Sequence, residues 1–164
     1  MKWKLSAALF FLFFACKKEN NYVPDTGNLN NNVTVDVLVK GVNSHGESVG
    51  NATIFSRTIN SPGDTLIVIV GGTDSGQVNI TLANIAVAGR YVFGQPLDSG
   101  RYVAIEYIEG NIIFGPATYY FQTDGEVIID SISEKHIAGT FKATCMNNGQ
   151  VAKITNGSFS GEFQ

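Results

Sequence analysis

Residues 137–145 read Ile137-Ala138-Gly139-Thr140-Phe141-Lys142-Ala143-Thr144-Cys145, and they carry the clearest structural signal in the sequence. Every odd position is apolar or glycine, while positions 140, 142 and 144 are polar. An alternation with a period of two is typical of a β-strand with one face in a core. The sequence Asn147-Asn148-Gly149 favours a tight turn, after which the chain returns through residues 151–163. We therefore predict a long C-terminal hairpin with Phe141, Phe159 and Phe163 in the core.

Similar short runs of β-branched and aromatic residues, separated by Gly, Asn and Asp, begin at residue 33 and continue to the end of the chain. No window keeps a helical period for three turns. The links between the runs are short, which predicts an all-β domain of about nine or ten antiparallel strands. We favour a β-sandwich, with an open barrel as the alternative. The stretch 71–76 is typical of a hairpin turn, and 43–47, which contains His45, has the composition of a loop. The expected strands lie at 33–39, 53–55, 66–70, 78–82, 91–93, 102–107, 117–122, 127–129, 137–145 and 151–163.

The N-terminus has the pattern of an export signal. Lys2 and Lys4 precede an uncharged apolar run at 5–15. That run is too short for a membrane span, which needs about 20 residues, but it suits the apolar part of a signal peptide. Cys16 follows Ala15 directly, which resembles the lipobox of bacterial lipoproteins, where the cysteine becomes the first mature residue and is acylated. The alternatives are ordinary cleavage with an incidental cysteine, or an uncleaved anchor.

These features predict three parts of the chain. Residues 1–15 are the lipoprotein signal peptide, residues 16–32 are the lipidated Cys16 with an Asn-rich flexible tether, and residues 33–164 are the all-β domain. Two signals are needed for stable anchoring by lipid chains, and a multiply acylated cysteine supplies them. We therefore expect a protein held in the bacterial cell envelope, at the outer membrane, by its N-terminal lipid.

Composition excludes several classes of protein. The chain has 164 residues, is 44% hydrophobic and carries 11 basic and 14 acidic residues. Removal of a signal peptide with Lys2 and Lys4 leaves 9 basic residues and a formal charge of −5. A nucleic-acid partner is therefore not expected, because phosphate binding needs clustered Lys and Arg. The two cysteines are too few for a disulfide scaffold.

Three C-terminal segments form a series, namely Gly-Glu-Val-Ile-Ile-Asp at 125–130, Lys-His-Ile-Ala-Gly-Thr-Phe-Lys-Ala at 135–143 and Ile-Thr-Asn-Gly-Ser-Phe at 154–159. Together they resemble the signature of a family of Bacteroidetes-type lipoproteins that is described as a domain of unknown function. The resemblance covers most of residues 50–164. It implies an all-β surface or periplasmic lipoprotein, and it brings no catalytic residue with it.

The sequence carries no metal-binding motif, since it lacks His-x-x-x-His, Cys-x-x-Cys and a calcium loop. Residues 46–50 match Gly-x-Ser-x-Gly, but no helical pattern follows them, as a nucleophile elbow would require. Glu106, Glu109, Asp124 and Glu126 are interpreted as solvated charges rather than as a glycosidase pair. Cys145 shares the apolar face of its strand, which favours a core residue over a nucleophile. We expect no enzyme activity, no catalytic residue, no metal and no other cofactor.

Aromatic residues crowd into positions 91–121 and supply the candidate binding residues. Three consecutive aromatics at 119–121 must place rings on both faces of a strand. Exposed tyrosines could stack on a sugar or pack in a protein interface. We therefore predict a binding or adhesion module for a glycan or an envelope protein. The alternatives are a structural envelope component without a ligand and a carbohydrate-active enzyme. The candidate ligand-binding residues are Tyr102, Tyr107, Tyr119 and Tyr120.

Overall fold

The computed structural model describes residues 30–49, 53–59, 63–94, 100–110 and 115–164. The predicted signal peptide, Cys16 and the tether up to residue 29 lie outside these ranges. The described chain forms ten antiparallel strands, which confirms the predicted all-β antiparallel fold and its strand number. The strands are β1 (Asn32–Val39), β2 (Val42–Val49), β3 (Ile54–Ile59), β4 (Thr65–Thr73), β5 (Gly76–Ala83), β6 (Gly89–Val92), β7 (Tyr102–Gly110), β8 (Ala117–Ile132), β9 (His136–Asn147) and β10 (Gln150–Glu162).

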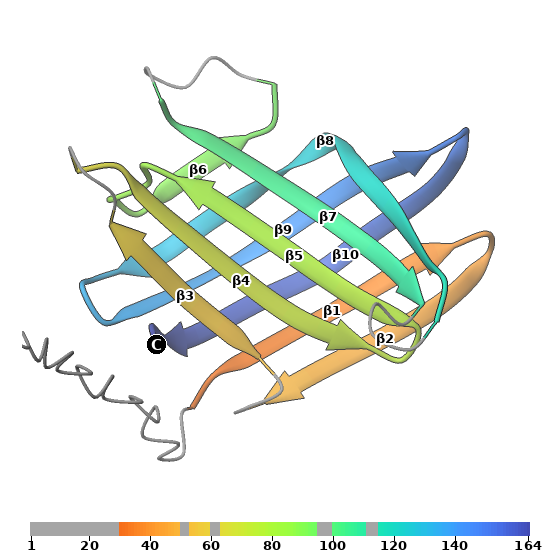
Figure 1. Ribbon diagram of the computed structural model, residues 1–164, viewed down its shortest axis with the longest axis horizontal. Coiled ribbons are helices and arrows are strands. Elements are labelled where there is room, and N and C mark those ends of the chain that lie inside the picture. Colours follow the sequence, from red (N-terminus) through yellow and green to blue (C-terminus); the bar gives the residue numbers. More distant parts are fainter. Residues whose placement is uncertain (1–29, 50–52, 60–62, 95–99, 111–114) are drawn as a thin grey trace, which may run out of the picture.

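All ten strands belong to one sheet, in the order β2-β1-β10-β9-β8-β7-β5-β4-β3, with β6 also paired to β8. The sheet curls so that β3, β4, β5 and β7 cross over β8, β9, β10, β1 and β2 (Figure 1). The buried apolar side chains of both halves form one core between them. Of the two expected arrangements, this curled half-barrel corresponds to the open barrel rather than to two separate sheets.

Strand β8 forms the bend between the two halves of the sheet. Its residues 117–121 pair with β7, whereas residues 126–129 pair with β6, and β9 follows it on the other side. The register with β9 shifts between Gln122 and Asp124. Where β7 leaves β8, the buried Gln122 accepts a hydrogen bond from the Ile105 amide at 2.9 Å through its side-chain oxygen. The segments 117–122 and 127–129, expected as separate strands, are therefore two parts of one bent strand.

The C-terminal hairpin is held together by two matching Gly-x-Phe sequences. Gly139 lies opposite Phe159, and Phe141 lies opposite Gly157. A Cβ atom added to Gly157 would lie 2.6 Å from the Phe141 ring, and one added to Gly139 would lie 2.8 Å from the Phe159 ring. Each glycine therefore makes room for the aromatic ring on the facing strand. The two rings are 6.2 Å apart between centroids. The predicted core positions of Phe141 and Phe159 are confirmed, while Phe163 is partly buried and packs against the core.

The prediction of a loop at 43–47 is wrong, because these residues form the middle of β2. The inward-facing residues of β2 are Ser44, Gly46 and Ser48, so the strand shows no apolar alternation. Small residues are needed there because β2 packs on the glycine-containing end of β4. The Ser48 hydroxyl accepts a hydrogen bond from the Gly72 amide at 2.7 Å and donates one to the Gly72 carbonyl at 3.0 Å. These contacts bring the β2 end of the sheet against β4.

Candidate functional site on the outer face of strands β8 to β10

The outward-facing residues of β8, β9 and β10 form rows that cross the sheet. Phe141 and Cys145 of β9 point into the core, so Thr140, Lys142, Thr144 and Met146 face outward. Register then fixes their neighbours on both sides. Thr144 lies between Asp124 of β8 and Lys153 of β10, and Met146 lies between Phe121 of β8 and Val151 of β10.

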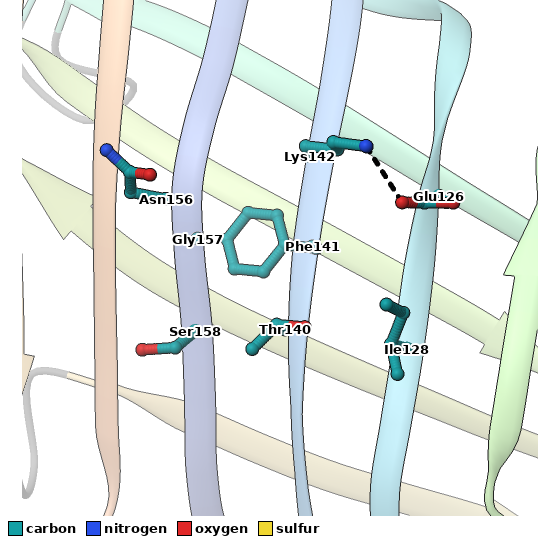
Figure 2. Close-up of a pocket in the computed structure, with 8 residues that line it drawn as sticks. All are labelled: Glu126, Ile128, Thr140, Phe141, Lys142, Asn156, Gly157 and Ser158. Carbon is teal, nitrogen blue, oxygen red and sulfur yellow. Dashed lines mark ion pairs between the residues drawn. The ribbon is translucent and has the colours of Figure 1, made fainter.

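Two adjoining depressions follow β9 between β8 and β10, with volumes of about 250 and 360 Å³. They share Lys142 and Asn156, and we call them together the outer groove. Figure 2 shows the first depression, with Phe141 and Gly157 between the two rows of polar side chains. The register between β9 and β10 shifts between Ile154 and Gly157, and Asn156 in this bulge has a positive φ of 52°. The bulge therefore shapes the β10 wall of the outer groove.

An ionic cluster occupies the β8 wall of the outer groove. The Glu126 carboxylate receives the Lys142 ammonium at 2.9 Å and the Arg90 guanidinium at 2.5 Å. These hydrogen bonds, that of Lys142 first, hold the pKa of Glu126 below its ordinary value. Figure 2 shows the Lys142–Glu126 pair at one end of the depression. Glu126 therefore stays ionised and is not a proton donor at neutral pH.

Asp124 and Lys153 face the outer groove from opposite walls. Both are exposed, and neither side chain makes a hydrogen bond or ion pair with another described residue. They are separated by two strand spacings, about 10 Å, with Thr144 between them. The groove thus carries an acceptor on one wall and a donor on the other, and their charges cancel.

Apolar side chains border the outer groove at the end near the β9–β10 turn. Phe121 is 57% exposed, Val151 is 43% exposed and Met146 is 40% exposed, and register places the three side by side. We call these three residues the apolar row. Tyr119, two residues before Phe121 on β8, is also exposed. Exposed apolar groups that adjoin one another are candidates for an interaction surface.

The four tyrosines predicted to bind a ligand do not lie together. Tyr107 and Tyr120 are fully buried, with ring centroids 5.8 Å apart. The Tyr120 hydroxyl donates a hydrogen bond to Glu109 at 2.8 Å, and burial followed by this bond raises the pKa of Tyr120. Neither ring presents a face to solvent, so we leave both out of the candidate site. Tyr102 is exposed but pairs with β5, away from the apolar row, and only Tyr119 adjoins that row.

Cys145 has the core position expected from its strand. Its thiol is buried and lies 3.6 Å from the Ile105 carbonyl oxygen. Burial raises the pKa of Cys145 to about 12, so the side chain remains a protonated thiol. Among the described residues, no group of three or more His, Cys, Asp or Glu side chains could hold a metal ion. Within the same ranges, no helix has the length and apolar character needed to cross a membrane.

A family model described as "Domain of unknown function (DUF6252)" matches residues 46–161. The chain belongs to this family. The resemblance to a domain of unknown function that the C-terminal segments predicted is thereby confirmed. The DUF6252 match begins within β2 and ends within β10, so it contains every residue of the outer groove and of the apolar row. No curated protein and no solved structure matches the chain.

Several residues of this DUF6252 surface were not among the predicted binding residues. Lys142, Thr144 and Met146 could have been predicted to face outward from the alternation of side chains along the strand, because Phe141 and Cys145 already identify the inward face of β9. Phe121 could have been found once one ring of the 119–121 triplet was known to be buried. Lys153 joins them only through the pairing of β9 with β10. The groove wall at Asn156 depends on a bulge, for which the sequence signal is the Asn156-Gly157 dipeptide, because Asn tolerates the positive φ found there.

A polar chain extends the site toward β2. Asn156 donates a hydrogen bond to one oxygen of Asp36 at 3.0 Å, and Nδ1 of His45 lies 2.7 Å from the other. The bond from Asn156, and then the contact with His45, lowers the pKa of Asp36. The hydrogen bond with Asp36 raises the pKa of His45 above its ordinary 6.5. The pair thus stabilises the fold fully between pH 3.8 and 6.5. Its contribution is lost as pH rises through the raised pKa of His45 or falls through the lowered pKa of Asp36.

A proton titration of His45 followed by NMR tests this contact. We expect a pKa above 6.5 in the full chain and a fall toward 6.5 in Asp36→Asn. Glu47→Gln is the matched control, because Glu47 makes the weakest contribution to the raised pKa of His45. Equal effects of the two substitutions would contradict the assigned role of Asp36.

Proposed function

We propose that the protein is a non-enzymatic, lipid-anchored binding module of the bacterial cell envelope, and that it engages its partner through the outer face of β8 to β10. The lipobox-like Ala15-Cys16 sequence after an apolar run supports the anchor. The observation that carries the binding role is the apolar row, which stays exposed on three neighbouring strands and borders the outer groove. A partner that covers this row would remove its apolar area from water.

The position of the apolar row fits a tethered module. Strand β1 begins at Asn32, which pairs with Ser160, and ends at Val39, which pairs with Ala152 beside the row. The seven-residue separation along β1 corresponds to about 23 Å at roughly 3.3 Å per residue. A lipid at Cys16 would therefore attach to the domain at the end remote from the apolar row. The row would then be free to contact a partner, because the tether joins the domain at the opposite end.

Capture from envelope material tests the proposed function. The full chain, held in detergent and immobilised, is incubated with a detergent extract of envelopes from cells that produce it. We expect the wild type to retain a component that Phe121→Ser does not retain. Tyr102→Ser is the matched control, because Tyr102 is an aromatic residue of similar exposure on another part of the sheet. Identical material on wild type and Phe121→Ser would argue against the outer face as the binding surface.

A further inference from the structure

The row Asp124–Thr144–Lys153 shows what kind of ligand the outer groove can recognise. The strands that carry Asp124 and Lys153 are about 10 Å apart, and neither side chain forms an ion pair or a hydrogen bond with the other or with another described residue. Their hydrogen-bonding capacity, with that of the intervening Thr144 hydroxyl, is open to a third group. Because the two charges cancel, the ligand requires no net charge of its own. It requires groups that both donate and accept hydrogen bonds, and hydroxyls do both.

The backbone around the outer groove excludes one common way of binding a peptide. Strand addition needs a free sheet edge with unpaired amides and carbonyls. Strand β9, which forms the floor, is paired to β8 on one side and to β10 on the other along the groove. The outward polar residues Thr140, Lys142 and Thr144 lie in the outer groove beside apolar atoms of Ile128 and Phe141. Recognition there must come from side chains, which offer a ligand both polar and apolar contacts.

The apolar row offers a contact for the apolar part of such a ligand. A sugar ring has an apolar face of C–H groups together with hydroxyls at its rim. Phe121 is more than half exposed and precedes Asp124 by three residues on β8, across the bulge. The negative face of an aromatic ring attracts polarised C–H groups, so one sugar could stack on Phe121 while its hydroxyls reach Asp124. Met146 and Val151 extend the apolar contact across the sheet.

The length of the surface indicates a chain rather than a single sugar. From Thr140 to Met146 the strand advances six residues, which is about 20 Å. Both depressions lie along this path and share Lys142 and Asn156, so polar contacts continue beyond the first sugar. We propose that the outer groove binds an uncharged glycan chain, with Phe121 as the stacking surface and with Asp124 and Lys153 as the hydrogen-bonding groups on its two walls. This assignment rests on the proposed binding function and names its ligand class.

Calorimetric titration of the full chain in detergent with defined oligosaccharides tests the assignment. The probes are cellohexaose, xylohexaose, mannohexaose and chitohexaose. We expect at least one of them to bind, and we expect Phe121→Ala and Lys153→Ala each to weaken that binding at least tenfold. The matched controls are Tyr102→Ala, an exposed aromatic on β7, and Lys135→Ala, an exposed lysine before β9. Both controls should change the affinity less than twofold.

The outcomes separate the glycan assignment from the proposed function. If no hexaose binds but envelope capture depends on Phe121, the glycan assignment is wrong while the binding function stands. If no hexaose binds and no capture occurs, both fail. If a hexaose binds and Phe121→Ala binds it equally well, the sugar lies elsewhere and the groove assignment is overturned. We expect each variant to unfold at the same temperature as the wild type, which would show that a loss of affinity does not come from a loss of folding.

Discussion

Replacing Phe141 by alanine is expected to lower the free energy of unfolding by about 3–5 kcal/mol, the usual cost of removing a buried aromatic side chain. The ring is 4% exposed and covers Gly157 on the facing strand, where no side chain can fill the space that it leaves. It also packs against Phe159, which covers Gly139 in the same manner. Chemical denaturation of the full chain, monitored by far-ultraviolet circular dichroism, measures this decrease in the free energy of unfolding.

Phe121→Ala is the matched control for this substitution. It removes the same ring from the neighbouring strand β8, but from a position that is 57% exposed on the outer face. Surface substitutions away from special features usually change stability by about 0.5 kcal/mol or less. We therefore expect the two variants to differ by more than 2 kcal/mol, a conservative margin between these ranges. Similar losses in both would mean that the Gly-x-Phe pairs do not organise the core as described.

Cys16→Ala is expected to abolish acyl labelling and to release the protein from the membrane fraction. Each buried methylene of a lipid chain contributes about 0.8 kcal/mol to membrane binding, and one chain alone holds a protein only marginally. Because the multiply acylated cysteine would supply all the chains, a single substitution should remove the whole anchor. The measurement is incorporation of a labelled fatty acid, together with the distribution of the protein between membrane and soluble fractions.

Cys145→Ala supplies the control, because it removes the other cysteine of the chain. That thiol is buried in the core, where no acyl chain can be attached. This variant should keep its label and its place in the membrane fraction. Undiminished labelling of Cys16→Ala would rule out the lipobox interpretation, whatever the domain binds.

The C-terminal hairpin was predictable because its signals are local. Alternation along 137–145 sets the inward face, the Asn148-Gly149 turn has the positive φ angles that this dipeptide favours, and pairing of β9 with β10 follows. Strand β2 was not predictable from alternation, since Ser44, Gly46 and Ser48 face inward. It is specified by its pairing with β1 and by the close approach to Gly72, neither of which a one-dimensional pattern reveals.

The candidate site was predictable only in part for the same reason. The triplet at 119–121 indicates that aromatic rings lie on both faces of a strand, but it does not say which ring is buried. Tyr120 points inward because it pairs with Tyr107 across strands β7 and β8. This pairing determines that the two flanking residues of the triplet face outward. The outer groove then needs two further long-range features, namely the β8 bend after Gln122 and the β10 bulge at Asn156.

We propose above that the outer face of β8 to β10 is the binding surface of an envelope-anchored domain. Titration of immobilised envelope extract with full-length wild type, Phe121→Ser and Tyr102→Ser tests it most directly. We predict saturable binding by the wild type, an equal curve for Tyr102→Ser and at least tenfold weaker binding by Phe121→Ser. Three superimposable curves, or no saturable binding by the wild type, would contradict the claim.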